Sequence, residues 1–183
     1  VFSDINRLKY ISNNIGKIQF IFAGKAHPKD WPAKELIKKI FSDINQLKDK
    51  IKIIYLENYD MELGKMLTTG VDLWLNTPLR PNEASGTSGM KAVHNGIPNF
   101  SVLDGWWLEG HIEGVTGWSI GPKATDVGSD NKSDAEELYE KLEEIIVPMF
   151  YNTRDGWIEI MQHSIAINAS FFNTHRMVQQ YVL

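Results

Sequence analysis

The segment from Glu83 to Lys91, which reads EASGTSGMK, contains the residues best suited to chemistry in this chain. It places two glycines and the hydroxyls of Thr87 and Ser88 where a loop is expected to enter a helix. Free backbone N–H groups at a helix start and the positive end of the helix dipole both favour a phosphate. The segment therefore predicts an anion site, with the two hydroxyls as further donors.

Lys91 follows Thr87 by four residues, so its amine and the anion site would share one helical face. A partly desolvated lysine in that place can form a Schiff base with an aldehyde cofactor whose phosphate the helix start holds. Pyridoxal phosphate has that shape. A solvated lysine is the alternative interpretation of the same pattern. The glycine spacing is not that of a Walker loop, which argues against nucleoside triphosphates.

The elements that position this segment alternate between strands and helices. Apolar, β-rich runs predict strands at 18–23, 51–57, 71–75 and 98–103, with a short strand around 115–120. Helical periodicity predicts helices at 5–15, 31–49, about 61–68, and from Thr87 or Ser88 to Asn95. This order predicts an α/β fold with a Rossmann-like doubly wound parallel sheet and right-handed crossovers.

The two ends of the chain are expected to be helical. Residues 5–15 carry an apolar stripe without a convincing cap before it, so we expect a fragment of a longer protein. Three helices are expected at 133–150, 152–168 and 170–182, the first with a capping box at Ser133 to Glu136. We therefore expect one domain, with the sheet portion at 1–132 and terminal helices at 133–183. The stretch from 104 to 134 is expected to end in a mobile loop.

Composition narrows the class of protein. The 183 residues are 43% hydrophobic and 23% charged, which is typical of a soluble globular domain. A formal charge of -4 gives no basic field for a polyanion, so we expect no nucleic-acid partner. No apolar run is long enough to span a bilayer, so no membrane partner is expected. The absence of cysteine excludes disulfides and fits a cytoplasmic protein.

In an open parallel sheet, ligands bind beyond the carboxyl ends of the strands. The loops expected there contain most of the unusual residues, namely Lys25, His27, Tyr59, Asp104, Glu109, Trp106 and Trp107. Lys25 and His27 are interpreted as ordinary loop residues, since a solvated lysine and a hydrogen-bonded histidine are common there. The two tryptophans could stack on a glucan or could cover the core.

The residues from Glu83 to Lys91, followed by His94-Asn95-Gly96 and Asp104-Gly105, resemble the pyridoxal-site signature of the α-glucan (glycogen or maltodextrin) phosphorylases. Gly24-Lys25-Ala26-His27-Pro28 and Leu56-Glu57-Asn58-Tyr59 are similar to two further motifs of that family, and 171–182 is similar to its terminal helix. The stretch 104–110, DGWWLEG, resembles the bacterial and archaeal branch. The resemblance covers nearly the whole chain.

The resemblance implies roles for seven residues. It implies that Lys91 carries pyridoxal phosphate and is the catalytic lysine, and that Thr87, Ser88 and Tyr59 complete the cofactor site. Glu83, Ser85 and Gly86 are implied to bind the glucose unit at the cleaved bond, since a carboxylate accepts strong hydrogen bonds from sugar hydroxyls. No metal site is implied.

The reaction implied is phosphorolysis of the terminal bond of an α-1,4-glucan by inorganic phosphate, which gives glucose 1-phosphate. The family places its active site between two Rossmann-like domains, of which this chain would supply most of the C-terminal one. We therefore expect the fragment alone to be inactive. The resemblance leaves a homodimer of the full-length protein open.

Two other functions stay open on sequence grounds. A nucleotide-sugar glucosyltransferase resembling glycogen synthase shares the two-domain architecture and needs no aldehyde cofactor. A noncatalytic glucan-binding fragment has the tryptophan-rich loop as its only positive argument.

Overall fold

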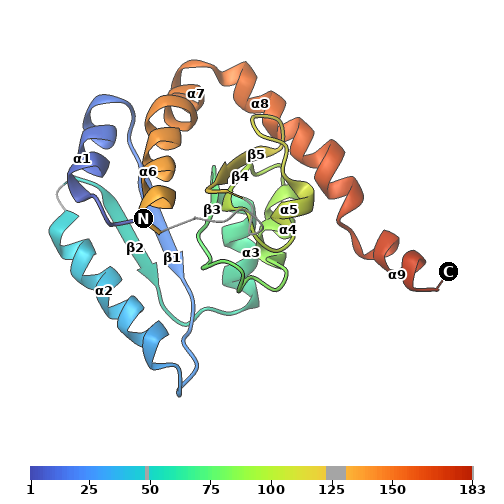
Figure 1. The fold of residues 1–183 in the computed structure, drawn as a ribbon, viewed down its shortest axis with the longest axis horizontal. Coiled ribbons are helices and arrows are strands. Elements are labelled where there is room, and N and C mark those ends of the chain that lie inside the picture. Colours follow the sequence, from blue (N-terminus) through green and yellow to red (C-terminus); the bar gives the residue numbers. More distant parts are fainter. Residues whose placement is uncertain (48–49, 123–130, 183) are drawn as a thin grey trace.

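The computed structural model describes residues 1–47, 50–122 and 131–182 and has the α/β arrangement that the sequence predicts (Figure 1). The strands are β1 (Gln19–Ala23), β2 (Lys52–Leu56), β3 (Trp74–Asn76), β4 (Asn99–Val102) and β5 (Gly117–Ile120). The helices between them are α1 (Ile5–Asn14), α2 (Trp31–Leu47), α3 (Met61–Gly70), α4 (Thr87–Val93) and α5 (Trp107–Gly110). Only the one-turn helix α5 lies where no element was predicted. The ends expected for the helix at 31–49 and for the loop before 134 lie partly outside the described residues.

The strands form two parallel sheets, whereas the sequence predicted one. β1 pairs with β2, with Phe20 opposite Ile53, and β3, β4 and β5 form the second sheet in that order. Within the described residues no strand joins β1 to β3, so each has one edge without a partner strand. The prediction of a single continuous sheet was therefore wrong for this chain, although the Rossmann-like class is confirmed.

One large hydrophobic cluster holds the fold together. It contains Leu8 and Ile11 of α1, Phe100 of β4, Trp118 of β5 and Leu142 of the C-terminal helical region. Both predicted portions of the chain thus contribute to one core. β4 and β5 are buried along their whole length, including the polar residues Asn99, Ser101 and Ser119.

The start of α1 carries a cap that the sequence analysis missed. The Asp4 carboxylate accepts a hydrogen bond of 2.9 Å from the backbone N–H of Arg7. The capping box predicted at Ser133 to Glu136 does not lie at the start of the helix, because α6 (Asn131–Lys141) begins two residues before Ser133.

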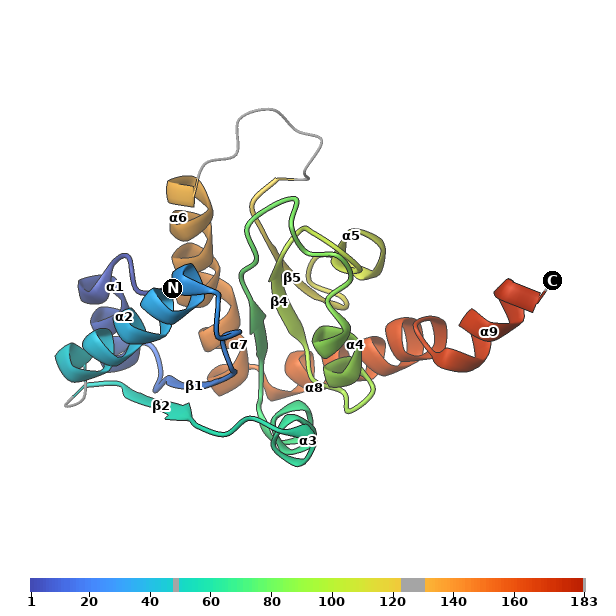
Figure 2. The same cartoon turned by 90° about the horizontal axis from the view of Figure 1, so that it is seen from below.

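The C-terminal third is helical as predicted. α6 continues through the π-helical segment η1 (Leu142–Ile146) into α7 (Val147–Asn152), and α8 (Arg154–His163) continues through η2 (Ser164–Ala169). The last helix, α9 (Thr174–Val182), has no buried residue and extends away from the rest of the chain (Figure 2). None of the helices in the described ranges is both long enough and apolar enough to cross a bilayer.

Candidate functional site

The predicted anion site lies where the loop after β3 enters α4. Gly86 precedes the helix with φ 84° and ψ 41°, a left-handed conformation that glycine adopts without strain. No side chain caps α4, and no described residue accepts a hydrogen bond from the N–H groups of Thr87 or Ser88. The helix therefore begins at Thr87, as predicted, and leaves two donors available for a ligand.

The Trp106 ring packs against this helix start. An added Cβ would lie 2.9 Å from the Trp106 ring at Gly86 and 2.8 Å from its indole nitrogen at Gly89. At Gly89 it would also lie 2.5 Å from the amide oxygen of Asn99, whose nitrogen donates to the Gly89 carbonyl at 3.3 Å. Both glycines of the motif are therefore needed for close packing of α4 on β4 and the loop that follows it.

Asp104 fixes the segment that carries Glu83 and Ser85. Its buried carboxylate accepts hydrogen bonds of 2.9 Å from the N–H groups of Glu83 and Gly105. The N–H of Trp106 donates to the Ser85 carbonyl at 2.8 Å. The loops that follow β3 and β4 are thus bound together, and this brings Glu83, Ser85 and Gly86 to one place. Sequence reasoning noted Asp104 without giving it a role, because its partner is set by the tertiary fold.

Tyr59 lines the same groove as Ser88 of this site. It follows β2, is partly exposed, and packs its ring against Gly64 of α3. Tyr59 and Ser88 both line the groove that separates β1 from β3. The predicted cofactor residues Tyr59 and Ser88 therefore face a common space.

Lys91 lies one turn into α4 and is exposed. No hydrogen bond or ion pair joins its amine to a residue in the described part of the chain. The amine is available for a ligand, but the partial desolvation that would favour a Schiff base is not supplied by the described residues.

The loop after β1 contains an exposed lysine and a hydrogen-bonded histidine, as expected. Lys25 is exposed, and the His27 ring accepts a hydrogen bond of 3.2 Å from the N–H of Lys29, which is a local turn interaction. The structural interpretation of His27 is confirmed.

The tryptophan-rich loop covers the core and does not present stacking surfaces. Trp106 and Trp107 are buried, their ring centroids lie 5.0 Å apart, and Phe172 packs edge-on to Trp106 at 5.1 Å. The Trp107 indole donates to the Trp118 carbonyl at 3.2 Å. Stacking of these two rings on a glucan is therefore excluded as they stand, and the glucan-binding alternative loses its only positive argument.

Arg80 was missed by the sequence analysis. Its guanidinium binds both carboxylate oxygens of Asp134 at 2.6 and 2.7 Å, and it also donates to the Ile120 carbonyl. Both side chains are largely buried. This pair ties the loop after β3 to the start of α6. No signal in the sequence links residues so far apart.

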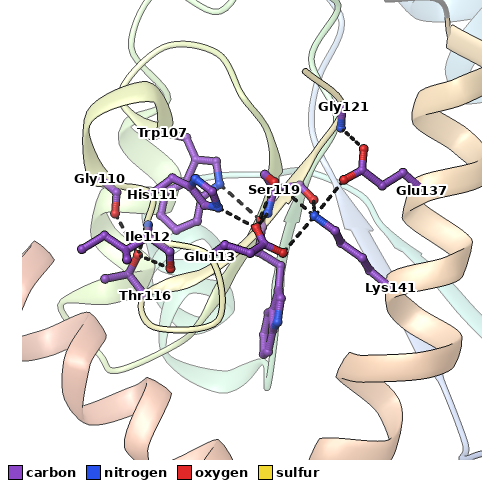
Figure 3. A network of polar contacts seen from close by, with 11 residues as sticks. Trp107, Gly110, His111, Ile112, Glu113, Thr116, Ser119, Gly121, Glu137 and Lys141 are labelled. Carbon is purple, nitrogen blue, oxygen red and sulfur yellow. Dashed lines mark hydrogen bonds and ion pairs between the residues drawn. The ribbon is translucent and has the colours of Figure 1, made fainter. Parts of the chain in front are cut away.

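A second polar network holds the loop between α5 and β5 against α6 (Figure 3). The Glu113 carboxylate accepts from the Ser119 N–H and hydroxyl at 2.9 Å, and contacts His111 at 2.7 Å and Lys141 at 2.9 Å. Partial burial opposes ionisation of Glu113, but hydrogen bonds from His111, Lys141 and Ser119 outweigh it and lower its pKa to about 2. Lys141 also pairs with Glu137 at 2.8 Å, and these partners raise the pKa of Lys141 despite its burial.

The fold defines a Rossmann-like α/β protein with a glycine-bounded helix entry after its third strand, β3. The sequence matches the carbohydrate phosphorylase family over residues 1–146, and the chain belongs to that family. It is 47% identical to maltodextrin phosphorylase of Thermococcus litoralis and 40% identical to glycogen phosphorylase of Aquifex aeolicus, over the whole of this chain. It is 40% identical to glycogen phosphorylase of Mycobacterium tuberculosis over 90% of this chain.

The chain spans 20 to 27% of the length of these relatives. Activity that belongs to a whole phosphorylase is therefore a proposal for this chain.

Proposed function

We propose that this chain is the cofactor-bearing part of an α-glucan phosphorylase, a glycosyltransferase that uses inorganic phosphate to cleave terminal α-1,4 bonds of glycogen or maltodextrin. The product would be glucose 1-phosphate. The observation that carries the proposal is the entry to α4, where the N–H groups of Thr87 and Ser88 have no partner among the described residues. Family membership and the relatives' names support the same reaction.

The residues around α4 fit pyridoxal phosphate. The backbone and hydroxyl donors of Thr87 and Ser88 would hold its phosphate, with the helix dipole adding to the attraction. Lys91 would hold its aldehyde carbon from one turn further along, and Tyr59 lines the same groove as Ser88. When bound, the cofactor supplies a phosphate group that acts as a proton donor or electrostatic partner to inorganic phosphate.

The loop held by Asp104 would bind the sugar. The Glu83 carboxylate would accept hydrogen bonds from hydroxyls of the terminal glucose. The backbone N–H groups of Ser85 and Gly86 would donate to hydroxyls of the same sugar. The Glu83 carboxylate has no hydrogen-bond partner in the described part of the chain, while the backbone N–H of Glu83 donates to Asp104. A carboxylate on a fixed backbone can discriminate the stereochemistry of the hydroxyls that reach it.

Lys91 is exposed, so another part of the protein would have to cover the site before phosphorolysis becomes efficient. We propose that the other domain of a complete phosphorylase covers it, and that this chain is a single Rossmann-like C-terminal unit. The isolated chain would then bind the cofactor but not catalyse phosphorolysis.

Absorbance titration of this chain tests the cofactor site. Pyridoxal phosphate should give the imine band with at least about tenfold higher affinity than pyridoxal, because only the former uses the donors at the start of α4. Lys91→Arg should abolish the band, while Lys65→Arg, at an exposed lysine of α3, should leave it unchanged. An unchanged band in Lys91→Arg, or equal affinity for the two aldehydes, would overturn the proposal.

A further inference from the structure

Arg80 anchors the loop between β3 and α4 to the opposite edge of its sheet. β4 lies between β3 and β5, yet the Arg80 guanidinium donates to the carbonyl of Ile120 in β5 at 3.2 Å and contacts both Asp134 oxygens. The Arg80 side chain is only 8% exposed, whereas its neighbours Leu79 and Pro81 are exposed. This part of the loop is therefore attached to the rest of the chain through the Arg80 side chain.

The surroundings of the ion pair keep it in one geometry. Gly121 closes over it with φ 69°, and an added Cβ there would collide with the Asp134 carboxylate and lie 2.5 Å from the Arg80 guanidinium. Further along α6, the Glu137 carboxylate accepts from the Gly121 N–H at 2.6 Å and pairs with Lys141 at 2.8 Å (Figure 3). Asp134 thus stands on a helix that is itself bonded to the end of β5.

Glu83 follows directly on the segment that Arg80 anchors. Residues 79–82 form a turn that is closed by a backbone hydrogen bond of 2.9 Å between its ends. The Glu83 N–H then donates to Asp104 at 2.9 Å, and an added Cβ at Gly105 would lie 2.9 Å from Cγ of Glu83. The Glu83 backbone is therefore held between two anchors, Arg80 before it and Asp104 beside it.

We propose that Arg80 is a positioning residue for sugar binding, which holds the Glu83 carboxylate in place by tying its loop to α6. The inference rests on the proposed function, in which Glu83 binds the terminal glucose. The guanidinium is occupied by Ile120 and Asp134, so Arg80 acts through Glu83 and not on the sugar. Replacing a buried ion pair by apolar residues is often neutral for stability, so the benefit of this pair lies in the geometry that it imposes.

Glucose binding by the complete phosphorylase that contains this chain tests the proposal. Combining Arg80→Met with Asp134→Leu leaves no unpaired charge buried, so the fold is kept. The inhibition constant of D-glucose should rise at least about fivefold, and KM for glucose 1-phosphate should rise more than kcat falls. Pyridoxal phosphate affinity, measured by absorbance, should change less than about twofold, because the donors at the start of α4 are untouched.

A second arginine–carboxylate pair supplies the matched control. Arg7 and Glu143 join α1 to η1 at 2.8 Å and are also partly buried, but they do not contact the loop between β3 and α4. Arg7→Met combined with Glu143→Leu should leave the inhibition constant of D-glucose within about twofold of the wild type.

The Glu83→Gln background separates positioning from a general loss of structure. There, removing the Arg80–Asp134 pair should weaken glucose binding by less than about twofold further, because the pair acts through the Glu83 carboxylate. Unchanged glucose binding without the pair, an equal loss in the Glu83→Gln background, or an equal loss in the control would overturn the inference. If Glu83→Gln alone leaves glucose binding unchanged, the proposed sugar site fails and the inference fails with it, which is a distinct result.

Discussion

The β3–β4–β5 half of the molecule is closely packed, whereas the β1–β2 half is more exposed. β4 and β5 are buried throughout, and the loops that leave β3 and β4 are joined by Asp104 and Trp106. In β1, by contrast, Gln19 and Ile21 are exposed, although β1 and β3 both line the groove. The difference teaches that the proposed ligand site rests mainly on close packing in the β3–β4–β5 half, while the β1–β2 half contributes a more exposed strand.

The largest expected effect comes from truncating one side chain in each half and comparing the losses of unfolding free energy. Trp107→Ala should lower the free energy of unfolding by about 3–5 kcal/mol, since the ring is fully buried and its indole is hydrogen-bonded. Ile21→Ala in β1 should cost under about 1 kcal/mol, because that side chain is 40% exposed. Urea unfolding of both variants measures the two losses of unfolding free energy. Equal losses would contradict the difference between the two halves.

A smaller effect is expected from removing the charge of Asp104, which joins the loops that follow β3 and β4. Asp104→Asn should lower the free energy of unfolding by about 1–3 kcal/mol, because an amide nitrogen would face the N–H of Glu83 or Gly105. It should also weaken glucose binding by the full-length phosphorylase that contains it, more than it weakens cofactor binding. Asp72→Asn, at a residue outside both loops, is the matched control. Unchanged stability in Asp104→Asn would show that the loops are held by Trp106 packing alone.

The smallest effect is expected from Glu113, which lies in the loop between α5 and β5. The folded pKa of Glu113 is about 2 and its ordinary value is 4.5, so its stabilisation is present above pH 4.5 and is lost as pH falls towards 2. Because the side chain is 44% exposed, solvent screening limits the effect to under about 1 kcal/mol. Glu113→Gln should therefore flatten the acid limb of a plot of unfolding free energy against pH. Glu136→Gln, at an exposed glutamate of α6, should keep the slope of the wild type.

The sequence predicted the elements well where a local pattern determines them. The strands around β4 and β5 and the start of α4 at Thr87 were located from apolar runs and from the glycine and hydroxyl pattern. The apolar stripe of α1 also predicted its buried face, with Leu8 and Ile11 in the core. In these cases a few neighbouring residues contain the whole signal.

Features that depend on distant contacts could not be predicted. The Arg80–Asp134 pair joins residues 54 positions apart, and the burial of Trp106 follows from its packing on Gly86, Gly89 and Phe172. The division of the sheet was not predictable either, because apolar runs specify strands but not the neighbour that each one pairs with.

Site mapping of the reduced cofactor adduct tests the central claim most directly. This chain should be incubated with pyridoxal phosphate, treated with borohydride, digested, and examined by mass spectrometry, with and without excess inorganic phosphate. We predict one dominant adduct at Lys91 that inorganic phosphate suppresses, because both phosphates compete for the donors at Thr87 and Ser88. Adducts spread over the surface lysines, or a Lys91 adduct indifferent to inorganic phosphate, would contradict the account.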